Sequence, residues 1–309
     1  DKEKNMRVHV VVDFTYIIYK YKFTLMSGRL KTLTYNDRDV SLLYYCMKEV
    51  ESFRSKLEKA GHDVIMTICF DSKSIRKEQA EKLGEDYKGK RESKLNNSDF
   101  ELIEEIKGIF ESIGYNVLKQ TGYEADDLVY TIVQREKKNF DFTIIYTPDK
   151  DVLINIEDNV AVMRYKQKKG YIQVEKSNFN SIMLDEFKCY IPYNVLALYL
   201  SSVGDKSDNI KGIHLFGPAA YERLIGKLIE AGYGHDGWDK YKDFNEMAKL
   251  IEACKQFLNE EQFKDLKQSF SLVKPIIVED KFLPEKLTTG SQESREKIYS
   301  KYGFQSLYS

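Results

Sequence analysis

The chain has 309 residues, of which 42% are hydrophobic and 31% charged, and its formal net charge is −1. This length suits one large α/β domain or two small ones, and the absence of any apolar run of about 18 residues excludes a membrane-spanning helix. The four cysteines show no CxxC spacing and the four histidines no zinc-ligand spacing. We therefore expect reduced, mostly buried thiols in a cytosolic protein, and no zinc site.

Four apolar runs predict buried strands, and each ends close to acidic residues. In chain order these runs are Val8–Val12, Val64–Phe70, Tyr115–Leu118 and Phe142–Thr147. Continuous apolar runs of this length are typical of parallel strands that are covered on both faces. The first run leads into Asp13 and the second run ends immediately before Asp71.

Amphipathic segments between these runs predict helices. Asp39–Ala60 has the pattern of a long helix that Gly61 closes. Ser98 with Glu101 predicts a capping box at the start of another helix, which Gly114 ends. Because strands and helices alternate with short connections, we expect an α/β fold with a three-layer, mostly parallel sheet.

The second half of the chain changes character. Val160–Lys166 and Tyr171–Lys176 predict a hairpin at the edge of the sheet, and strands largely stop after residue 185. The helices expected beyond that point lie at Val195–Val203, Ala219–Ala231 and, as a pair, within Glu246–Phe270. We therefore expect an α/β catalytic domain over residues 6–185, with a basic insertion at 72–97, and a helical region over residues 186–309 that packs on the sheet.

The acidic residues near the strand ends predict a metal site. Parallel strands bring their carboxyl ends to one edge of the sheet, which is where ligands bind. One such residue alone is more often a turn, a helix cap or a partner of a helix dipole. Two carboxylates about 4 Å apart repel by roughly 4 kcal/mol at an effective dielectric near 20, so a cluster of them favours bound Mg²⁺ or Mn²⁺. The residues expected there are Asp13, Asp71, Glu124, Asp126, Asp127, Asp149 and Asp151, with Asp205 and Asp208 as a further pair.

Positive charge is concentrated in two segments despite the near-neutral total. Residues 73–97 carry eight Lys or Arg against five Asp or Glu. A second basic group consists of Arg164, Lys166, Lys168, Lys169 and Lys176. Most such runs are solvated loops, but basic flanks beside an acidic edge suit a polyanionic substrate that bridges to metal ions.

Six motifs follow one another in a fixed order. They are Asp13, Phe70-Asp71, Tyr87-Lys88-Gly89-Lys90-Arg91, Glu124-Ala125-Asp126-Asp127, Thr147-Pro148-Asp149-Lys150-Asp151 and Gly204-Asp205-Lys206-Ser207-Asp208-Asn209-Ile210. Over about residues 6–225 this order resembles the 5′ nuclease family, which includes phage flap endonucleases, the 5′ nuclease domain of DNA polymerase I and phage RNase H-type 5′→3′ exonucleases. Phe14 replaces the usual glycine after Asp13, which makes the RNase H-type members more similar there.

The resemblance implies two metal ions, Mg²⁺ with Mn²⁺ as a substitute. Such ions, about 4 Å apart, bind the attacking water and the leaving oxygen of a phosphodiester, and no protein nucleophile is needed. The first ion would be held by Asp13, Asp71, Glu124, Asp126 and Asp127, and the second by Asp149, Asp151, Asp205 and Asp208.

The resemblance also implies that residues 72–97 form a helical arch that single-stranded 5′ ends enter. Lys88 and Arg91 would stabilise charge on the scissile phosphate, and Tyr87 would stack on a base. The phosphate contacts expected from this segment are Lys73, Arg76 and Lys90.

Residues 208–220 resemble the helix-three-turn-helix with which the family grips duplex DNA. The DNA contacts expected here are Lys211, Gly212 and Gly217, beside the start of a helix. The sequence departs from the family pattern at three positions: the central glycine of the turn is Leu215, the following isoleucine is Phe216, and the lysine of the second helix is Ala219.

Three other interpretations stay open. Asp13-Phe14-Thr15 suggests a haloacid dehalogenase-type phosphatase, but that class needs a second aspartate where Thr15 stands. A PIN-like ribonuclease would share the acidic sheet edge, and an inactive nucleic-acid-binding module would share the fold. We favour a metal-dependent, structure-specific 5′→3′ nuclease for DNA with 5′ flaps or ends and for RNA–DNA primer hybrids. We expect it to act as a monomer in the cytoplasm, or in the host cytoplasm if it is phage-encoded. Replication proteins are the expected partners, and no association with a membrane is expected.

Overall fold

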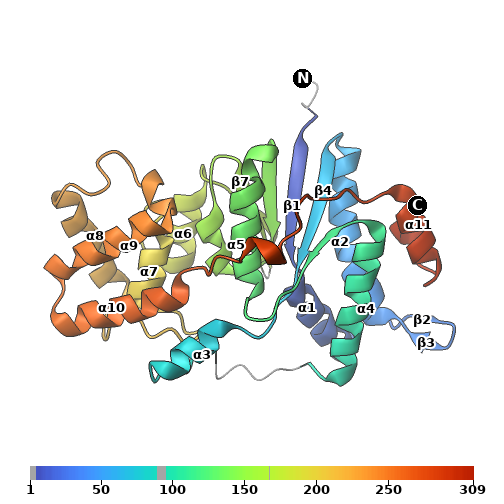
Figure 1. Cartoon of the computed structure of the whole chain (residues 1–309), viewed down its shortest axis with the longest axis horizontal. Helices are drawn as coiled ribbons and strands as arrows, with labels where there is room; N and C mark the ends of the chain where they lie inside the picture. The colour runs from blue at the N-terminus through green and yellow to red at the C-terminus, as the bar shows by residue number, and fades with distance from the viewer. Residues whose placement is uncertain (1–4, 89–94, 167) are drawn as a thin grey trace.

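A six-stranded sheet forms the centre of the computed structural model, which describes residues 5–88, 95–166 and 168–309. The strand order is β5-β4-β1-β6-β7-β8, and all neighbours are parallel except β7 and β8 (Figure 1). The strands are β1 (Arg7–Asp13), β4 (Asp63–Cys69), β5 (Asn116–Leu118), β6 (Phe142–Tyr146), β7 (Val160–Lys166) and β8 (Gly170–Val174). The predicted mostly parallel sheet and its edge hairpin are confirmed.

The strand β1 shows why these segments pair at the centre of the sheet. Val8, Val10 and Val12 belong to the core on one face, and Val11 belongs to the core on the other face. All four are fully buried, and β-branched side chains pack well on a pleated surface that is covered on both sides.

Helices cover both faces of the sheet and complete the predicted three layers (Figure 1). One face carries α1 (Phe14–Met26), α2 (Ser41–Lys59), α4 (Asn97–Ile113) and α11 (Gln292–Ser300). The other face carries α5 (Ala125–Glu136), α6 (Phe179–Phe187) and α7 (Leu196–Val203). A lobe beyond α7 contains α8 (Pro218–Glu230), α9 (Phe244–Ala253) and α10 (Glu260–Val273). The small hairpin β2 (Thr34–Tyr35) and β3 (Arg38–Asp39) and the helix α3 (Ile75–Lys82) project from the α/β part.

Two helix boundaries test the sequence patterns. The long helix closed by Gly61 is confirmed as α2. The helix α4 ends at Gly114 as expected, but its predicted capping box is wrong by two residues. The Asn96 side chain accepts a hydrogen bond from the Asp99 amide at 3.0 Å, and the Asp99 carboxylate accepts one from the Asn96 amide at 2.8 Å. These two hydrogen bonds satisfy amides at the start of the helix, so Asn96 and not Ser98 caps it.

The last segment of the chain returns from the helical lobe to the sheet (Figure 1). Beyond α10 it passes α5 and reaches β5, where the Thr288 amide donates to Asn116 at 2.8 Å. Tyr299 in α11 is fully buried, and its hydroxyl donates to Glu51 of α2 at 2.7 Å. Residues 288–309 therefore pack with the α/β core.

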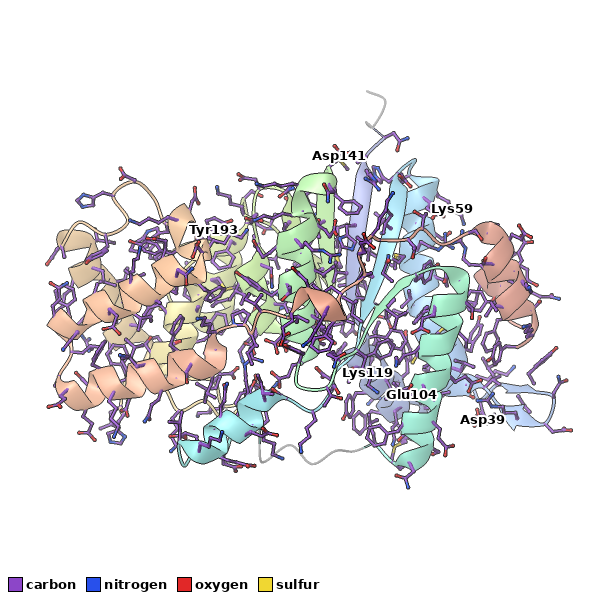
Figure 2. All side chains as sticks on the ribbon, in the orientation of Figure 1. Asp39, Lys59, Glu104, Lys119, Asp141 and Tyr193 are labelled. Atoms are coloured by element: carbon purple, nitrogen blue, oxygen red, sulfur yellow. The ribbon has the colours of Figure 1, made fainter. Side chains whose placement is uncertain are left out.

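The four cysteines are buried and free, as expected. In the described ranges, no helix combines the length and the hydrophobicity that crossing a bilayer requires. The ion pair between Glu104 and Lys119, at 2.9 Å, lies on the surface (Figure 2). Asp141 lies at the edge of the sheet where β1 begins (Figure 2).

His9 makes the folding stability depend on pH. It is fully buried in β1, its Nε2 lies 2.7 Å from the Thr67 hydroxyl, and its ring stacks on Phe140. Burial, with a smaller effect of Arg135 and Arg7, lowers its pKa to about 3. The unfolded chain binds a proton at His9 below about pH 6.5 and the folded chain does not, so this residue reduces stability as the pH falls from 6.5 towards 3.

We therefore expect the His9→Asn variant to lose less stability than the wild type between pH 6.5 and pH 4.5. The difference should approach about 1.4 kcal/mol per pH unit, which urea unfolding at several pH values measures. Parallel pH profiles of the two proteins would contradict a neutral buried His9.

Candidate functional site

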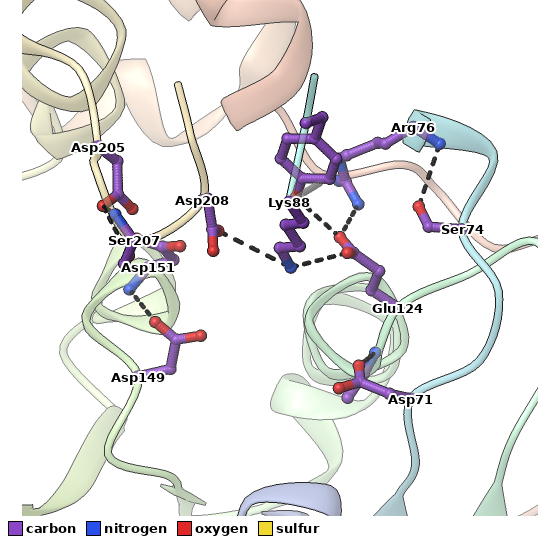
Figure 3. Close-up of polar contacts among 12 residues, drawn as sticks. Asp71, Ser74, Arg76, Lys88, Glu124, Asp149, Asp151, Asp205, Ser207 and Asp208 are labelled. Carbon is purple, nitrogen blue, oxygen red and sulfur yellow. Dashed lines mark hydrogen bonds and ion pairs between the residues drawn. The ribbon is translucent and has the colours of Figure 1, made fainter. Parts of the chain in front are cut away.

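Acidic side chains from distant parts of the chain meet at the carboxyl edge of the sheet (Figure 3). Asp13 ends β1, Asp71 follows β4, and Asp149 follows β6. These three strands are parallel neighbours, so their ends must lie side by side. The start of α5 supplies Glu124 and the three residues after it, and the loop after α7 supplies the Asp205–Asp208 pair.

Two groups of carboxylates have the spacing that a metal ion needs. Asp126, Asp149 and Asp151 each place one oxygen within 4.8 Å of the others, and so do Asp151, Asp205 and Asp208. Asp151 belongs to both groups. This arrangement differs from the predicted division, in which Asp126 and Asp151 served different ions, and among the described residues Asp127 joins neither group.

The buried oxygens of this centre suit a hard cation. Asp13 Oδ1, Asp151 Oδ1 and Asp205 Oδ2 are buried, and no group in the described part of the chain donates a hydrogen bond to them. Loss of hydration raises the pKa of Asp13, Asp126 and Asp151, and neighbouring carboxylates raise it further. A divalent cation removes both costs, because it binds the deprotonated carboxylates and neutralises their repulsion. The donor set is therefore suited to Mg²⁺ or Mn²⁺.

Lys88 places a positive charge beside this centre. Its Nζ lies 2.7 Å from Glu124 Oε1 and 3.8 Å from Asp208 Oδ2 (Figure 3). Burial alone lowers the pKa of Lys88, but Tyr87, Glu124 and Asp208 outweigh it and raise that pKa above its usual value. The ammonium group is therefore charged at neutral pH. In the same way, Lys88 and Arg76 hold the pKa of Glu124 below its usual range despite its burial.

Arg76 is a structural residue, which corrects its predicted contact with DNA. It is buried, with 3% of its surface exposed, and its guanidinium forms ion pairs with both oxygens of the fully buried Asp127. It also donates to Glu124 at 2.8 Å and to the carbonyl of Lys274 at 2.9 Å. Asp127 completes its hydrogen bonds with the amides of Glu124 and Ile276. All four acceptor positions of Asp127 are thus occupied by donors of the protein itself.

Tyr87 is not available to stack on a base in this structure. Only 4% of its surface is exposed, and it packs with Ala80, Ile210 and Leu272. Its hydroxyl donates to Glu124 at 3.1 Å. The residue therefore anchors the segment that carries Lys88. Lys90 and Arg91, which were also expected to act on phosphates, lie outside the described residues, and Lys73 is exposed at the start of the insertion.

The segment before residue 89 is fastened to the loop after α7. The Lys88 amide donates to the Asp208 carbonyl at 3.1 Å, and the Asn209 side chain donates to the Asp86 carbonyl at 2.6 Å. Lys211 forms an ion pair with Glu85 at 2.9 Å. These contacts hold the base of the insertion over the acidic edge.

Two of the three departures from the family pattern, Leu215 and Phe216, lie in the turn between α7 and α8, and the third, Ala219, lies in α8. Gly212 has a φ of +70°, and a Cβ there would lie 2.5 Å from the Gly204 amide nitrogen, so close packing explains this glycine without any DNA contact. Gly217 caps α8. Leu215 has the left-handed φ of +55° and is 91% exposed. A bulky residue with that backbone is strained, which is why glycine is usual at such a position.

Three residues of the centre were not predicted. Lys150 donates to Asp205 at 2.8 Å and to Ser207, the Thr147 hydroxyl donates to Asp13 at 3.2 Å, and the Thr15 hydroxyl accepts from the Asp71 amide at 2.9 Å. Lys150 stands between two predicted ligands in the sequence, and this position is the signal that could have identified it as part of the centre. The roles of the two threonines depend on strand geometry that the sequence does not display.

The sequence of residues 8–183, more than half of the chain, matches the family described as the 5′-3′ exonuclease, N-terminal resolvase-like domain. This chain belongs to that family. It is 28% identical over 205 residues to a 5′-3′ exonuclease of Mycoplasmopsis pulmonis, and this match covers 66% of this chain and 62% of the relative. It is 27% identical over 209 residues to a 5′-3′ exonuclease of Aquifex aeolicus, and this match covers 68% of this chain and 64% of the relative. The match thus spans less than two thirds of each of these two relatives.

Solved structures share the fold of this family member. The T5 D15 protein crystallised with metal ions superposes with a TM-score of 0.53 at 17% identity, over 86% of each chain. The T5 D15 flap endonuclease in complex with DNA and metal ions gives a TM-score of 0.52 at 17% identity, over 86% of this chain and 99% of that one. The catalytic core of Rad2 in complex with a DNA substrate gives 0.51 at 14% identity, over 95% of this chain and 86% of that one.

The assignment of Arg76 as a structural residue leads to a stability prediction. Removal of one partner from a buried ion pair leaves an uncompensated charge and typically costs about 3–5 kcal/mol. We expect Arg76→Met to lower the free energy of unfolding by about this amount in urea titrations. Lys77→Met, one position along α3 and exposed, should change it by less than about 0.5 kcal/mol. If the Arg76→Met variant kept its stability but showed a weaker salt dependence of DNA binding, this would instead support the predicted contact of Arg76 with DNA.

Proposed function

We propose that this chain is a divalent-metal-dependent 5′→3′ nuclease that hydrolyses phosphodiester bonds in DNA. The observation that carries the proposal is the pair of carboxylate groups that share Asp151 at the carboxyl edge of the sheet. Family membership and the fold shared with flap endonucleases support the same conclusion. The phosphatase and the inactive-module interpretations lack comparable support.

The carboxylate centre would hold Mg²⁺ ions, with Mn²⁺ as a substitute. The residues proposed as ligands, directly or through water, are Asp126, Asp149, Asp151, Asp205 and Asp208, with Asp13 and Asp71 beside them. Bound there, such ions supply a water nucleophile at neutral pH and neutralise charge on the phosphate.

The protein's own groups would orient the substrate. Lys88 stays charged between Glu124 and Asp208, so it can attract a phosphate oxygen at the edge of the centre. Arg76 and Tyr87 bind the other oxygen of Glu124 and thereby hold its carboxylate in place for Lys88. Stabilisation of developing negative charge by a fixed cation is among the largest contributions that a protein makes to such reactions.

The substrates we propose are DNA with a 5′ flap or 5′ end and RNA–DNA primer hybrids, processed during replication and repair in the cytoplasm. The DNA complexes of the T5 flap endonuclease and of Rad2, whose fold this chain shares, support a DNA substrate. An assay that compares flap, nicked and primer-hybrid substrates with linear RNA separates this proposal from a PIN-like ribonuclease, which would cleave the linear RNA as well or better.

Asp151 provides the most direct test, because it belongs to both carboxylate groups. We expect Asp151→Asn to lower Mg²⁺-dependent cleavage of a 5′-flap substrate by more than about 100-fold, since a residue that only supports the metal ligands already contributes about 10- to 100-fold. DNA affinity, measured by fluorescence anisotropy without divalent ions, should change little. Asp158→Asn, an exposed aspartate outside the centre, serves as the control and should retain wild-type turnover. Wild-type turnover of the Asp151→Asn variant would refute the metal role.

Lys88 provides a second test that separates chemistry from binding. We expect Lys88→Ala to lower the single-turnover cleavage rate by about 100- to 1,000-fold, because a fixed cation next to the reacting phosphate is lost. Lys82→Ala, on the exposed end of α3, should leave the rate unchanged. A reduced affinity with an unchanged single-turnover rate would make Lys88 a simple backbone contact.

A further inference from the structure

An exposed pair of tyrosines lies outside the carboxylate centre and takes no part in its chemistry. Tyr165 of β7 and Tyr171 of β8 are direct cross-strand partners, and their ring centroids are 5.4 Å apart. Tyr165 is 38% exposed and Tyr171 is 47% exposed. Large aromatic surface that remains accessible on a rigid hairpin is a common feature of sites that bind nucleobases.

Tyr171 is held in place by contacts with α2 and with the strand β6. The Tyr171 hydroxyl donates to the buried Glu49 at 2.5 Å, and the Tyr146 hydroxyl donates to the same carboxylate at 2.8 Å. The rings of Tyr146 and Tyr171 are 5.6 Å apart, and Tyr146 in turn contacts Phe53 in the core. Tyr171 is therefore held by a row of packed rings before any ligand binds, and Tyr165 packs against it as the outermost ring.

A lysine supplies positive charge at the same place. Lys20 Nζ lies 4.9 Å from the centroid of the Tyr165 ring and 5.6 Å from that of the Tyr171 ring, and it forms an ion pair with Glu49 at 3.0 Å. The hairpin tip adds Lys168 and Lys169, which are exposed. A ring surface with cations around it suits a base whose neighbouring phosphates are negative.

The position of the pair relates it to the carboxylate centre. The strand β7 is parallel to β6, and Tyr165 is the second-last residue of β7, so it lies towards the same edge of the sheet as Asp13. Along α1, Lys20 follows Asp13 by seven residues, which is about 10 Å of helix. At roughly 3.4 Å per stacked nucleotide, this corresponds to about three nucleotides.

We propose that Tyr165 and Tyr171 form a stacking platform for an unpaired nucleobase of the DNA substrate, about three nucleotides from the scissile bond. The identity of the ligand rests on the proposed nuclease function, whereas the platform itself is a binding site that works without metal ions. Stacking tolerates every base, so the platform selects for an unpaired strand at this point and not for a sequence.

A purely structural role for these rings makes a different prediction. Among the described residues, nothing accepts or donates a hydrogen bond at the Tyr165 hydroxyl, so Tyr165→Phe removes no contact, while Tyr165→Leu removes the aromatic face and keeps an apolar side chain. Stacking on the ring therefore predicts that phenylalanine preserves binding and leucine does not.

The experiment uses the full chain without divalent ions and a 5′-flap DNA with 2-aminopurine at one position at a time. For the wild type, we expect fluorescence quenching by stacking at about the third nucleotide from the flap junction. Tyr165→Phe should keep the quenching and the affinity. Tyr165→Leu should abolish the quenching at that position and weaken flap binding by about tenfold, which is the size of effect expected for the loss of one base–aromatic stack.

Tyr190→Leu serves as a matched control, because Tyr190 is a tyrosine of similar exposure, 49%, on the connection between α6 and α7. It should leave the quenching unchanged. Thermal unfolding of each variant checks the fold. If Tyr165→Leu fails to fold, Tyr165→Trp, which keeps a stacking face, replaces it. The platform then requires that the Tyr165→Trp variant still quenches the fluorescence. Unchanged quenching in Tyr165→Leu, equal losses in the Phe and Leu variants, or no position-dependent quenching in the wild type would overturn the platform.

The outcome is separable from that of the proposed function. Quenching with no Mg²⁺-dependent cleavage by the wild type would support the platform and contradict the nuclease. Cleavage without position-dependent quenching would do the reverse.

Discussion

Repulsion among carboxylates at one edge of a parallel sheet is the constraint on which this structure depends. The strand order forces Asp13, Asp71 and Asp149 together, whatever the side chains prefer. Where carboxylate oxygens lie within 4.8 Å of one another, as in the two groups that share Asp151, each pair costs roughly 3–4 kcal/mol at an effective dielectric near 20 if left uncompensated. The fold responds with cations at the margins, which among the described residues include Lys88 and Lys150. Both lysines lie at the margin of the carboxylate centre, so the space between its carboxylates stays open to a metal ion.

The acidic residues fall into two groups, according to whether groups of the protein itself compensate their negative charge. Asp127 and Glu124 are satisfied by the protein, mainly through Arg76, and this buried network ties α3, α5 and the segment after α10 together. Asp126 and Asp151 belong to the other group, whose oxygens lie close to one another and have raised pKa values. The same four-residue motif at the start of α5 thus supplies a structural anchor and a candidate metal ligand, one residue apart.

The sequence was sufficient for the sheet and for the convergence of the acidic residues, because apolar runs that end near aspartates specify both strand type and strand end. It was not sufficient to divide those residues between ions and internal partners. The pairing of Arg76 with Asp127 depends on how α3 is turned, and no local pattern encodes a contact across 51 positions. The capping box was misplaced because two overlapping patterns, at Asn96 and Ser98, competed. The tyrosine pair becomes visible only once the register of β7 and β8 is known.

The return of the chain from the helical lobe affects the order in which the molecule can be completed. The amide of Ile276 is one of the donors to Asp127, although 149 positions separate the two residues. During synthesis at roughly 5–20 residues per second, that donor emerges about 7 to 30 seconds after Asp127. Through this interval the nascent chain carries Asp127 with an acceptor unfilled and Arg76 without the Lys274 carbonyl. The acidic edge therefore matures late on the ribosome, long after the strands that define it have been made.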